Sequence, residues 1–207
     1  MSDNSSNNRP GTGIIGPVRL VFLNVFKPRI NDMKTPPLQE FSCVALIPKT
    51  ANEFCSDPVS VGKTVVKLIK ESAEAKFGQK LPPKWVTPLK DGDAELNNEG
   101  EPKFPGYHYI GLSCGAEYPP LLIDCHREKV AGGWQSGDWG MVKVSCYGYD
   151  HPSGKRGVGC GLRAIQFLRH DEAFGVAAVT TPDEFESRDG DAPLTALSSD
   201  NYDPFAD

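Results

Sequence analysis

The segment 139–167, WGMVKVSCYGYDHPSGKRGVGCGLRAIQF, constrains the fold of this chain more than any other segment. Its first half alternates between two classes of residue, which is typical of a β-strand with one buried and one exposed face. The buried parity holds Val142, Val144 and Cys146, and the exposed parity holds Lys143, Ser145, Tyr147 and Tyr149. The turn 151–154, His-Pro-Ser-Gly, reverses the chain, because Pro fixes φ and Gly accepts positive φ. The segment therefore predicts a long β-hairpin.

The second strand of this hairpin is predicted to present a polar face beside the tyrosines. One parity holds Val158, Cys160, Leu162 and Ala164, and the other holds Gly159, Gly161, Arg163 and Ile165. An exposed face with two tyrosines, two glycines and two cations suits a flat, negatively charged ligand with π faces, and single-stranded nucleic acid is such a ligand. The alternative is a solvated hairpin whose tyrosines only fill space.

The remaining periodic segments predict a small β-barrel. Residues 18–26, 38–47, 107–114 and 121–125 have the composition or alternation of strands. Residues 58–77 have a helical period, with Asp57 and Gly78 as start and stop signals. Five or six strands, one helix and no βαβ repetition indicate a mainly β fold. We expect an antiparallel barrel of the oligonucleotide/oligosaccharide-binding (OB) type, with one amphipathic helix, long loops and a disordered acidic C-terminal tail.

Charge divides the chain into a body and a tail. Residues 171–207 contain ten acidic residues and one basic residue, a net charge of −9, whereas residues 1–170 carry +4. A basic body with its own anionic tail points to nucleic acid and to an interaction tail. We therefore predict a flexible N-terminus at residues 1–16, an OB-like single-stranded DNA (ssDNA)-binding domain at 17–170, and a disordered tail at 171–207.

Two phosphate-binding motifs occur in the wrong context. The GTGIIG at residues 11–16 matches the dinucleotide-binding fingerprint but follows a polar terminus and precedes Pro17. That motif requires a strand before it and a helix after it. Gly62-Lys63-Thr64 resembles the end of a nucleotide-binding P-loop but lies inside the predicted helix, and Asp57 replaces the first glycine. We therefore expect neither a dinucleotide site nor NTPase activity.

The six cysteines contain no CxxC pair. We expect them to be free thiols in a reducing cytoplasm. Cys125 and His126, beside Cys114, could be a fragment of a zinc site, but the paired-ligand spacing is missing. We predict no metal and no cofactor. No apolar run approaches the length of a membrane span, and the polar start lacks the features of a secretory signal.

The candidate DNA contacts follow from parity and from loop composition. The long loop 79–106 carries Trp85, Lys90, Lys103 and Phe104. Trp134 is flanked by glycines, so it is the best single candidate for an exposed stacking platform, with burial under the long loop as the alternative. Phosphates are assigned to Lys143, Lys155, Arg156 and Arg163, and bases to Tyr107, Tyr109, Trp134, Trp139, Tyr147 and Tyr149.

The chain ends in SSDNYDPFAD, which places aromatic residues among carboxylates. Such a segment can insert an aromatic ring into an apolar pocket ringed by Arg or Lys on another protein. The predicted docking residues are Asp200, Tyr202, Asp203, Pro204 and Phe205. The alternative is a tail that only keeps the protein in solution.

Scattered fragments of the body resemble a tailed-phage family of ssDNA-binding proteins with the OB fold, formerly a family of unknown function. The fragments are Ser42–Lys49, Trp85, Pro88–Asp93, Tyr107–Tyr109, Ser136-Gly137, Gly159–Leu162 and Gln166. The resemblance covers most of residues 18–170 and implies a non-enzymatic phage protein in the cytoplasm of the infected bacterium. Such a protein coats ssDNA with little sequence preference in replication or recombination and recruits partner proteins through its tail. The resemblance does not identify which residues of this chain contact DNA.

Two other functions remain open. A metal-dependent nuclease or hydrolase could use Asp91, Asp93 and Asp124, because phosphoryl-transfer chemistry needs carboxylates gathered around a metal. The commoner meaning of Asp91-Gly92-Asp93 is an acidic turn. A virion protein whose barrel binds another protein is the third possibility.

Overall fold

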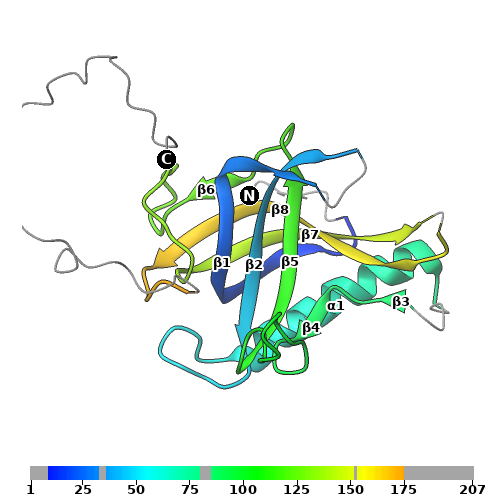
Figure 1. Cartoon of the computed structure of the whole chain (residues 1–207), viewed down its shortest axis with the longest axis horizontal. Coiled ribbons are helices and arrows are strands. Elements are labelled where there is room, and N and C mark those ends of the chain that lie inside the picture. Colours follow the sequence, from blue (N-terminus) through cyan, green and yellow to red (C-terminus); the bar gives the residue numbers. More distant parts are fainter. Residues whose placement is uncertain (1–8, 33–35, 80–84, 152, 175–207) are drawn as a thin grey trace, which may run out of the picture. The chain divides into compact units, whose positions relative to one another are not determined.

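The computed structural model describes residues 9–32, 36–79, 85–151 and 153–174. Five strands form a closed barrel: β1 (Thr12–Asn31), β2 (Leu38–Pro48), β5 (Tyr107–Gly115), β7 (Trp139–Asp150) and β8 (Arg156–Arg169). β1 pairs antiparallel with β2 and β7, β2 with β5, and β7 with β8 (Figure 1). A parallel contact between Ser113 of β5 and Gly161 of β8 closes the barrel. The predicted OB-type barrel is confirmed.

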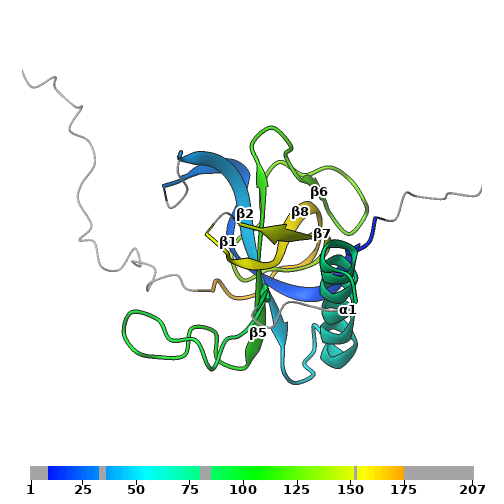
Figure 2. The same ribbon diagram turned by 90° about the vertical axis from the view of Figure 1, so that its right-hand side faces the viewer.

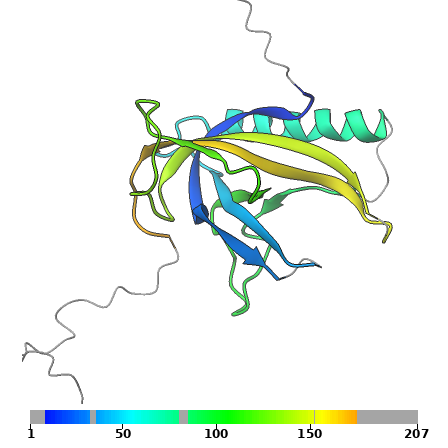
Figure 3. The same cartoon turned by 90° about the horizontal axis from the view of Figure 1, so that it is seen from above.

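One helix, α1 (Pro58–Phe77), lies along the barrel beside β7 (Figures 2 and 3). Its bounds are those predicted, because local signals determine both ends: the Asp57 side chain accepts a hydrogen bond from the Ser60 amide, and Gly78 donates to Glu74. The apolar stripe that includes Val61, Val65 and Leu68 is buried in the main core.

Three short strands extend the barrel: β3 (Trp85–Val86), β4 (Leu89–Asp91) and β6 (Leu121–Ile123). β3 and β6 pair parallel with β8, and β4 pairs antiparallel with β5. The hairpin of β1 and β2 extends beyond the barrel (Figure 3). The described residues contain no helix that is both long and apolar enough to cross a bilayer.

The β7–β8 hairpin is confirmed, with one correction to its parity. Val142, Val144 and Cys146 are buried as predicted. In β8, however, Ile165 is buried, whereas the regular alternation placed it outside. The reason is a β-bulge: Lys143 and Val144 are adjacent, but their partners Ala164 and Leu162 are separated by Arg163.

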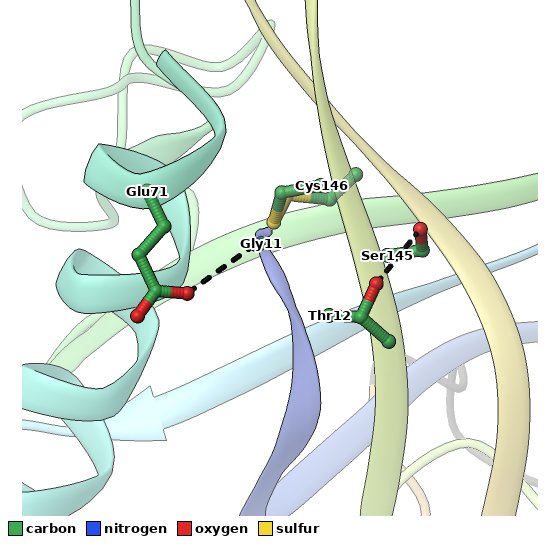
Figure 4. The surroundings of a disulfide bond; sticks show 6 residues. Gly11, Thr12, Glu71, Ser145 and Cys146 are labelled. Atoms are coloured by element: carbon green, nitrogen blue, oxygen red, sulfur yellow. Dashed lines mark hydrogen bonds between the residues drawn. A yellow bond between two sulfur atoms is a disulfide. The ribbon is translucent and has the colours of Figure 1, made fainter. Parts of the chain in front are cut away.

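The predicted flexible N-terminus is too long. β1 begins at Thr12, and the glycine-rich stretch that suggested flexibility packs closely under α1. A Cβ atom at Gly11 would lie 2.8 Å from Cβ of Ser72, and one at Gly13 would lie 2.9 Å from the Leu68 side chain. Gly11 also donates to Glu71 (Figure 4). Its carbonyl accepts a hydrogen bond from the Cys146 amide. These glycines therefore allow a close approach of backbone to helix.

The expectation that all cysteines are free is wrong for one pair. Cys146 and Cys160 face each other across β7 and β8 and form a disulfide (Figure 4). The free cysteines among the described residues are Cys43, Cys55, Cys114 and Cys125. Burial raises the pKa of Cys43 to about 12, so this thiol stays protonated at neutral pH.

The ordered domain continues past residue 170. The Arg19 guanidinium forms an ion pair with Asp171 and donates to the Glu172 carbonyl, at 3.3 and 2.8 Å. The Phe174 amide donates to the Ser136 carbonyl. The predicted domain boundary is therefore four residues too early. The proposed docking residues Asp200, Tyr202, Asp203, Pro204 and Phe205 lie outside the described residues.

Candidate nucleic-acid interface

An open groove crosses the outer face of β2 and β5. It consists of two hollows, of about 480 and 650 Å³, that share Glu40 and Ser113. The smaller hollow reaches toward β1 and is lined by Phe22, Asn24, Arg29, Glu40, Ser42, Cys43, Val44, Lys103, Gly111, Leu112 and Ser113. The larger one reaches toward the β7–β8 hairpin and is lined by Leu38, Gln39, Glu40, Ser113, Cys114, Gly115, Ala116, Glu117, Tyr118, Tyr147, Gly161, Leu162 and Arg163.

Small residues keep the floor of the groove open. Ser42, Gly111, Ser113 and Gly115 line the groove on β2 and β5, where larger side chains would fill it. A Cβ atom at Gly111 or Gly115 would meet nothing within 4 Å. In OB barrels, this face of the second and third barrel strands, with the neighbouring loops, binds oligonucleotides.

Three cations line the groove: Arg29, Lys103 and Arg163. None of them forms an ion pair with another described residue. Arg163 occupies the extra position of the β8 bulge, and bulges re-aim side chains in this way. Guanidinium and ammonium groups without carboxylate partners are suited to bind phosphates.

Acidic residues are also present in the groove. Glu40 is buried where the two hollows meet and accepts a hydrogen bond from Nδ2 of Asn31 at 2.7 Å. Glu117 lines the larger hollow. Each hollow therefore contains both cations and carboxylates, and the groove is not a purely basic stripe.

Aromatic rings project from the groove walls. Tyr147 and Tyr118 are 56% and 69% exposed. Tyr147 lies across Gly159, its cross-strand partner, where a Cβ atom would come within 2.8 Å of the ring. Gly159, one of the two glycines of the predicted exposed face, thus makes room for a tyrosine ring. Sequence reasoning missed Tyr118, because it lies in the turn after β5, where parity gives no signal.

An ion-pair clamp holds the loop 92–106 at the edge of the groove. Nζ of Lys49 donates to Asp91 and Asp93, and Asp93 accepts from the Gly106 amide at 2.8 Å. The hydrogen bonds from Lys49 lower the pKa of both carboxyls, and those to the carboxylates raise the pKa of Lys49. The clamped loop carries Phe104, which packs over the outer face of the barrel.

Two predicted stacking residues are buried, which corrects the prediction that they are exposed. Tyr109 is on the predicted outer parity but is only 6% exposed, because Phe104 covers its ring with a centroid distance of 4.8 Å. Trp139 is 2% exposed, stacks on Phe54 and donates from Nε1 to Asp171. Tyr107 is half-buried against the same small outer cluster as Tyr109.

Trp134 is not a free platform. Its indole stacks between Phe167 and His170, at centroid distances of 4.6 and 4.2 Å. It is half-buried against the main core, not under the long loop. Both of its ring faces are therefore already occupied.

The other predicted contacts lie outside the groove. Lys143 is exposed on β7, with Ile14 and Ala164 as its cross-strand neighbours. Tyr149 lies over Gly157 toward the hairpin tip, Lys155 is exposed at the turn, and Arg156 pairs with Asp150 at 3.1 Å. Of the ten predicted DNA contacts, the groove brings together Tyr147 and Arg163.

The carboxylates of the nuclease alternative are engaged in other contacts. Asp91 and Asp93 hold Lys49, and Asp124 accepts from the amides of His126 and Glu128 in a turn. Within the described part of the chain, no group of three or more His, Cys, Asp or Glu residues is arranged to hold a metal ion. This applies to Cys114, Cys125 and His126 as well.

Solved structures with a similar fold are phage proteins. The ssDNA-binding protein of bacteriophage Enc34, in complex with ssDNA, superimposes with a TM-score of 0.64 at 18% identity, over 80% of this chain and 90% of that chain. The ssDNA-binding protein gp2.5 of bacteriophage T7 gives a TM-score of 0.50 at 16% identity, over 86% of this chain and 98% of that one. At these identities the likeness establishes the fold.

Sequence comparison identifies the family. The putative protein p50 of Acyrthosiphon pisum secondary endosymbiont phage 1 is 33% identical over 102 residues, which is 47% of this chain and half the length of that relative. The family model described as the ssDNA-binding protein of Enterobacter phage Enc34 matches residues 12–195. Because this match covers most of the chain, the protein belongs to the Enc34 ssDNA-binding protein family.

Proposed function

We propose that the protein binds ssDNA in the groove on β2 and β5, with little sequence preference, as a non-enzymatic accessory of phage DNA replication or recombination. One observation supports this proposal most strongly. The groove lies on the face of the barrel that binds oligonucleotides in OB folds, and it combines an open floor with exposed aromatic rings and cations that form no ion pair. The naming of the family after an ssDNA-binding protein supports it. The site of action would be the cytoplasm of the infected bacterium.

Affinity should come from two sources, phosphate neutralisation and base stacking. Arg29, Lys103 and Arg163 are the proposed phosphate contacts, and Tyr118 and Tyr147 are the proposed platforms. Each stacked base contributes roughly 1–3 kcal/mol. Because every base has a π face, stacking of this kind tolerates any sequence. The extended hairpin, with Tyr149, Lys155 and Arg156, would continue the track beyond the groove.

The direct test is a titration of fluorescently labelled oligo-dT by anisotropy, with duplex DNA and RNA of the same length in parallel. We expect tight binding to oligo-dT that weakens with salt, with a log–log slope near −0.7 per phosphate neutralised. Trp139 is buried and Trp134 is stacked between two rings, so any change in Trp fluorescence should come mainly from the half-buried Trp85. Absence of binding at low salt would overturn the proposal and favour a virion protein with a protein ligand.

The same oligonucleotides, incubated with Mg²⁺ or Mn²⁺, test the absence of nuclease activity. We expect no cleavage, because Asp91 and Asp93 are occupied by Lys49. Cleavage that is lost in an Asp91→Asn variant would revive the nuclease alternative.

For the acidic tail we propose recruitment of a replication or recombination protein through its terminal aromatic residues, supported by the charge and composition of residues 200–207.

A further inference from the structure

Phe22 has a backbone conformation that its side chain disfavours. Its φ is +52°, and Arg127 is the other non-glycine residue with positive φ in the described part of the chain. In this left-handed region the Cβ atom crowds the following carbonyl oxygen, and bulky residues are rarely found there. Strained residues of this kind persist only where the surrounding structure fixes them, and they concentrate at functional sites.

The strain arises from a bulge in β1. Phe22 and Leu23 lie between Val21 and Asn24, whereas only one residue separates the partners Val44 and Ser42 on β2. In a common type of bulge the first extra residue adopts the left-handed conformation and is a glycine. Here phenylalanine takes the place that glycine occupies at no conformational cost.

Neighbouring hydrogen bonds hold the bulge in this shape. The Leu23 amide donates to Oγ of Ser136 at 3.2 Å, and Nδ2 of Asn24 donates to the Phe22 carbonyl at 3.1 Å. The Gly137 amide donates to the Leu20 carbonyl just before the bulge. None of these bonds involves the phenyl ring, so the scaffold that imposes the conformation does not require a phenylalanine.

The ring contributes little to the core. It is 54% exposed, whereas Val21 and Val25 on the same strand are buried. The Phe22 ring contacts the Phe104 ring edge-on, at a centroid distance of 6.2 Å, and this contact leaves part of the Phe22 ring surface open. Phe22 lines the smaller hollow together with Lys103.

Lys103 lines the same hollow, and both Lys103 and Phe22 contact the ring of Phe104. Its Nζ lies 5.9 Å from the centroid of the Phe104 ring and 5.7 Å from that of Tyr109, so aromatic rings position the ammonium. A phenyl ring and an ammonium that line one hollow match the two parts of a nucleotide, its base and its phosphate.

We infer that Phe22 and Lys103 form a one-nucleotide subsite, in which the base stacks on Phe22 and the neighbouring phosphate binds Lys103. This subsite rests on the proposed ssDNA-binding function and locates one contact of the strand at the β1 end of the groove. The conformational strain at Phe22 is retained because it holds the ring toward the ligand.

The test pairs affinity with stability in Phe22→Gly. Glycine relieves the left-handed strain and removes the ring, so the melting temperature should stay equal or rise while oligo-dT affinity falls about 5- to 150-fold. Phe22→Leu, which keeps apolar bulk without a π face, should lose affinity similarly. Phe22→Trp, which keeps a π face, should retain the affinity of the wild type. Val59→Ala, which removes an exposed apolar side chain on α1, away from the groove, is the matched control and should bind like the wild type.

A second readout isolates stacking. The ratio of affinities for oligo-dT and for an abasic oligonucleotide of the same length should be smaller in Phe22→Gly than in the wild type. Unchanged affinity in Phe22→Gly, or a loss matched by a fall in melting temperature, would overturn the subsite and leave the proposed function intact. Failure of the wild type to bind any single strand would instead overturn the proposed function.

Discussion

Arg163 and Lys143 are a matched pair of exposed cations on adjacent strands of the hairpin. The bulge in β8 places Arg163 in the groove wall, whereas Lys143 lies outside the groove. Both were predicted as phosphate contacts on parity alone, and parity could not separate them because the bulge shifts the register only in β8. The structure therefore distinguishes two residues that the sequence treats alike.

Arg163→Met should reduce the magnitude of the salt slope for oligo-dT binding by about 0.7, which corresponds to one lost phosphate contact. Lys143→Met should leave the slope unchanged, because its side chain lies away from the bound strand. Anisotropy titrations at several salt concentrations measure both slopes. Equal effects of the two substitutions would contradict the assignment of the groove.

Cys114 offers a probe that needs no substitution. It is a half-buried free thiol in the larger hollow, and Cys125 is an exposed free thiol that does not line it. Burial raises the pKa of Cys114, with Arg163 opposing the shift, so its alkylation should be slow and faster at alkaline pH. Bound oligo-dT should slow maleimide labelling of Cys114 and leave Cys125 unaffected, as measured by peptide mass spectrometry. Equal labelling rates of Cys114 with and without oligo-dT would argue against occupation of this hollow.

At the scale of elements, the clamp of Lys49 on Asp91 and Asp93 is one of the contacts that hold the loop 92–106 in place. This loop carries Lys103, which lines the groove, and the buried Phe104, whose packing anchors the loop together with the clamp. The clamp is exposed, so its contribution to global stability should be small, and its main effect should be on the loop.

Lys49→Met should therefore weaken oligo-dT binding and increase hydrogen exchange in the loop 92–106. The pKa values of Asp91 and Asp93 are lowered from 3.8, so the clamp is complete above pH 3.8 and is lost as the pH falls through the lowered values. The difference in loop exchange between wild type and Lys49→Met should accordingly disappear at low pH. A difference that persists in acid would show that the clamp is not what orders the loop.

Local sequence patterns predicted the helix and the strands well. The binding site was predicted less well, because it depends on contacts between residues far apart in the sequence. The helix at residues 58–77 was predictable because its hydrophobic period and the signals at both of its ends lie within one short segment of sequence. The burial of Tyr109 was not, because Phe104 reaches it from a loop with no periodicity. The glycines at 11 and 13 suggested flexibility, since nothing in the sequence shows that α1 packs against them. The position of Phe22 in the groove could not be predicted either. It depends on a bulge in β1, and a bulge can be recognised only from the pairing with the neighbouring strand.

At the scale of the whole molecule, the negative charge of the C-terminal segment should oppose the binding of DNA. Residues 176–207 carry eight acidic residues and one basic residue, against a mildly basic domain. An anionic segment attached to the domain should compete with DNA for the groove cations. We expect deletion of residues 176–207 to tighten oligo-dT binding at low salt, with a smaller effect at high salt. Unchanged or weaker binding at low salt would remove the competition.

The proposed function requires that single strands occupy the outer face of β2 and β5. Photocrosslinking of an oligonucleotide that carries 5-iododeoxyuridine, followed by peptide mapping, tests it most directly. We expect crosslinks at Tyr118, Tyr147 and Phe22, which line the groove. Crosslinks confined to α1, or to the surface around Ile14 and Lys143, would contradict the account.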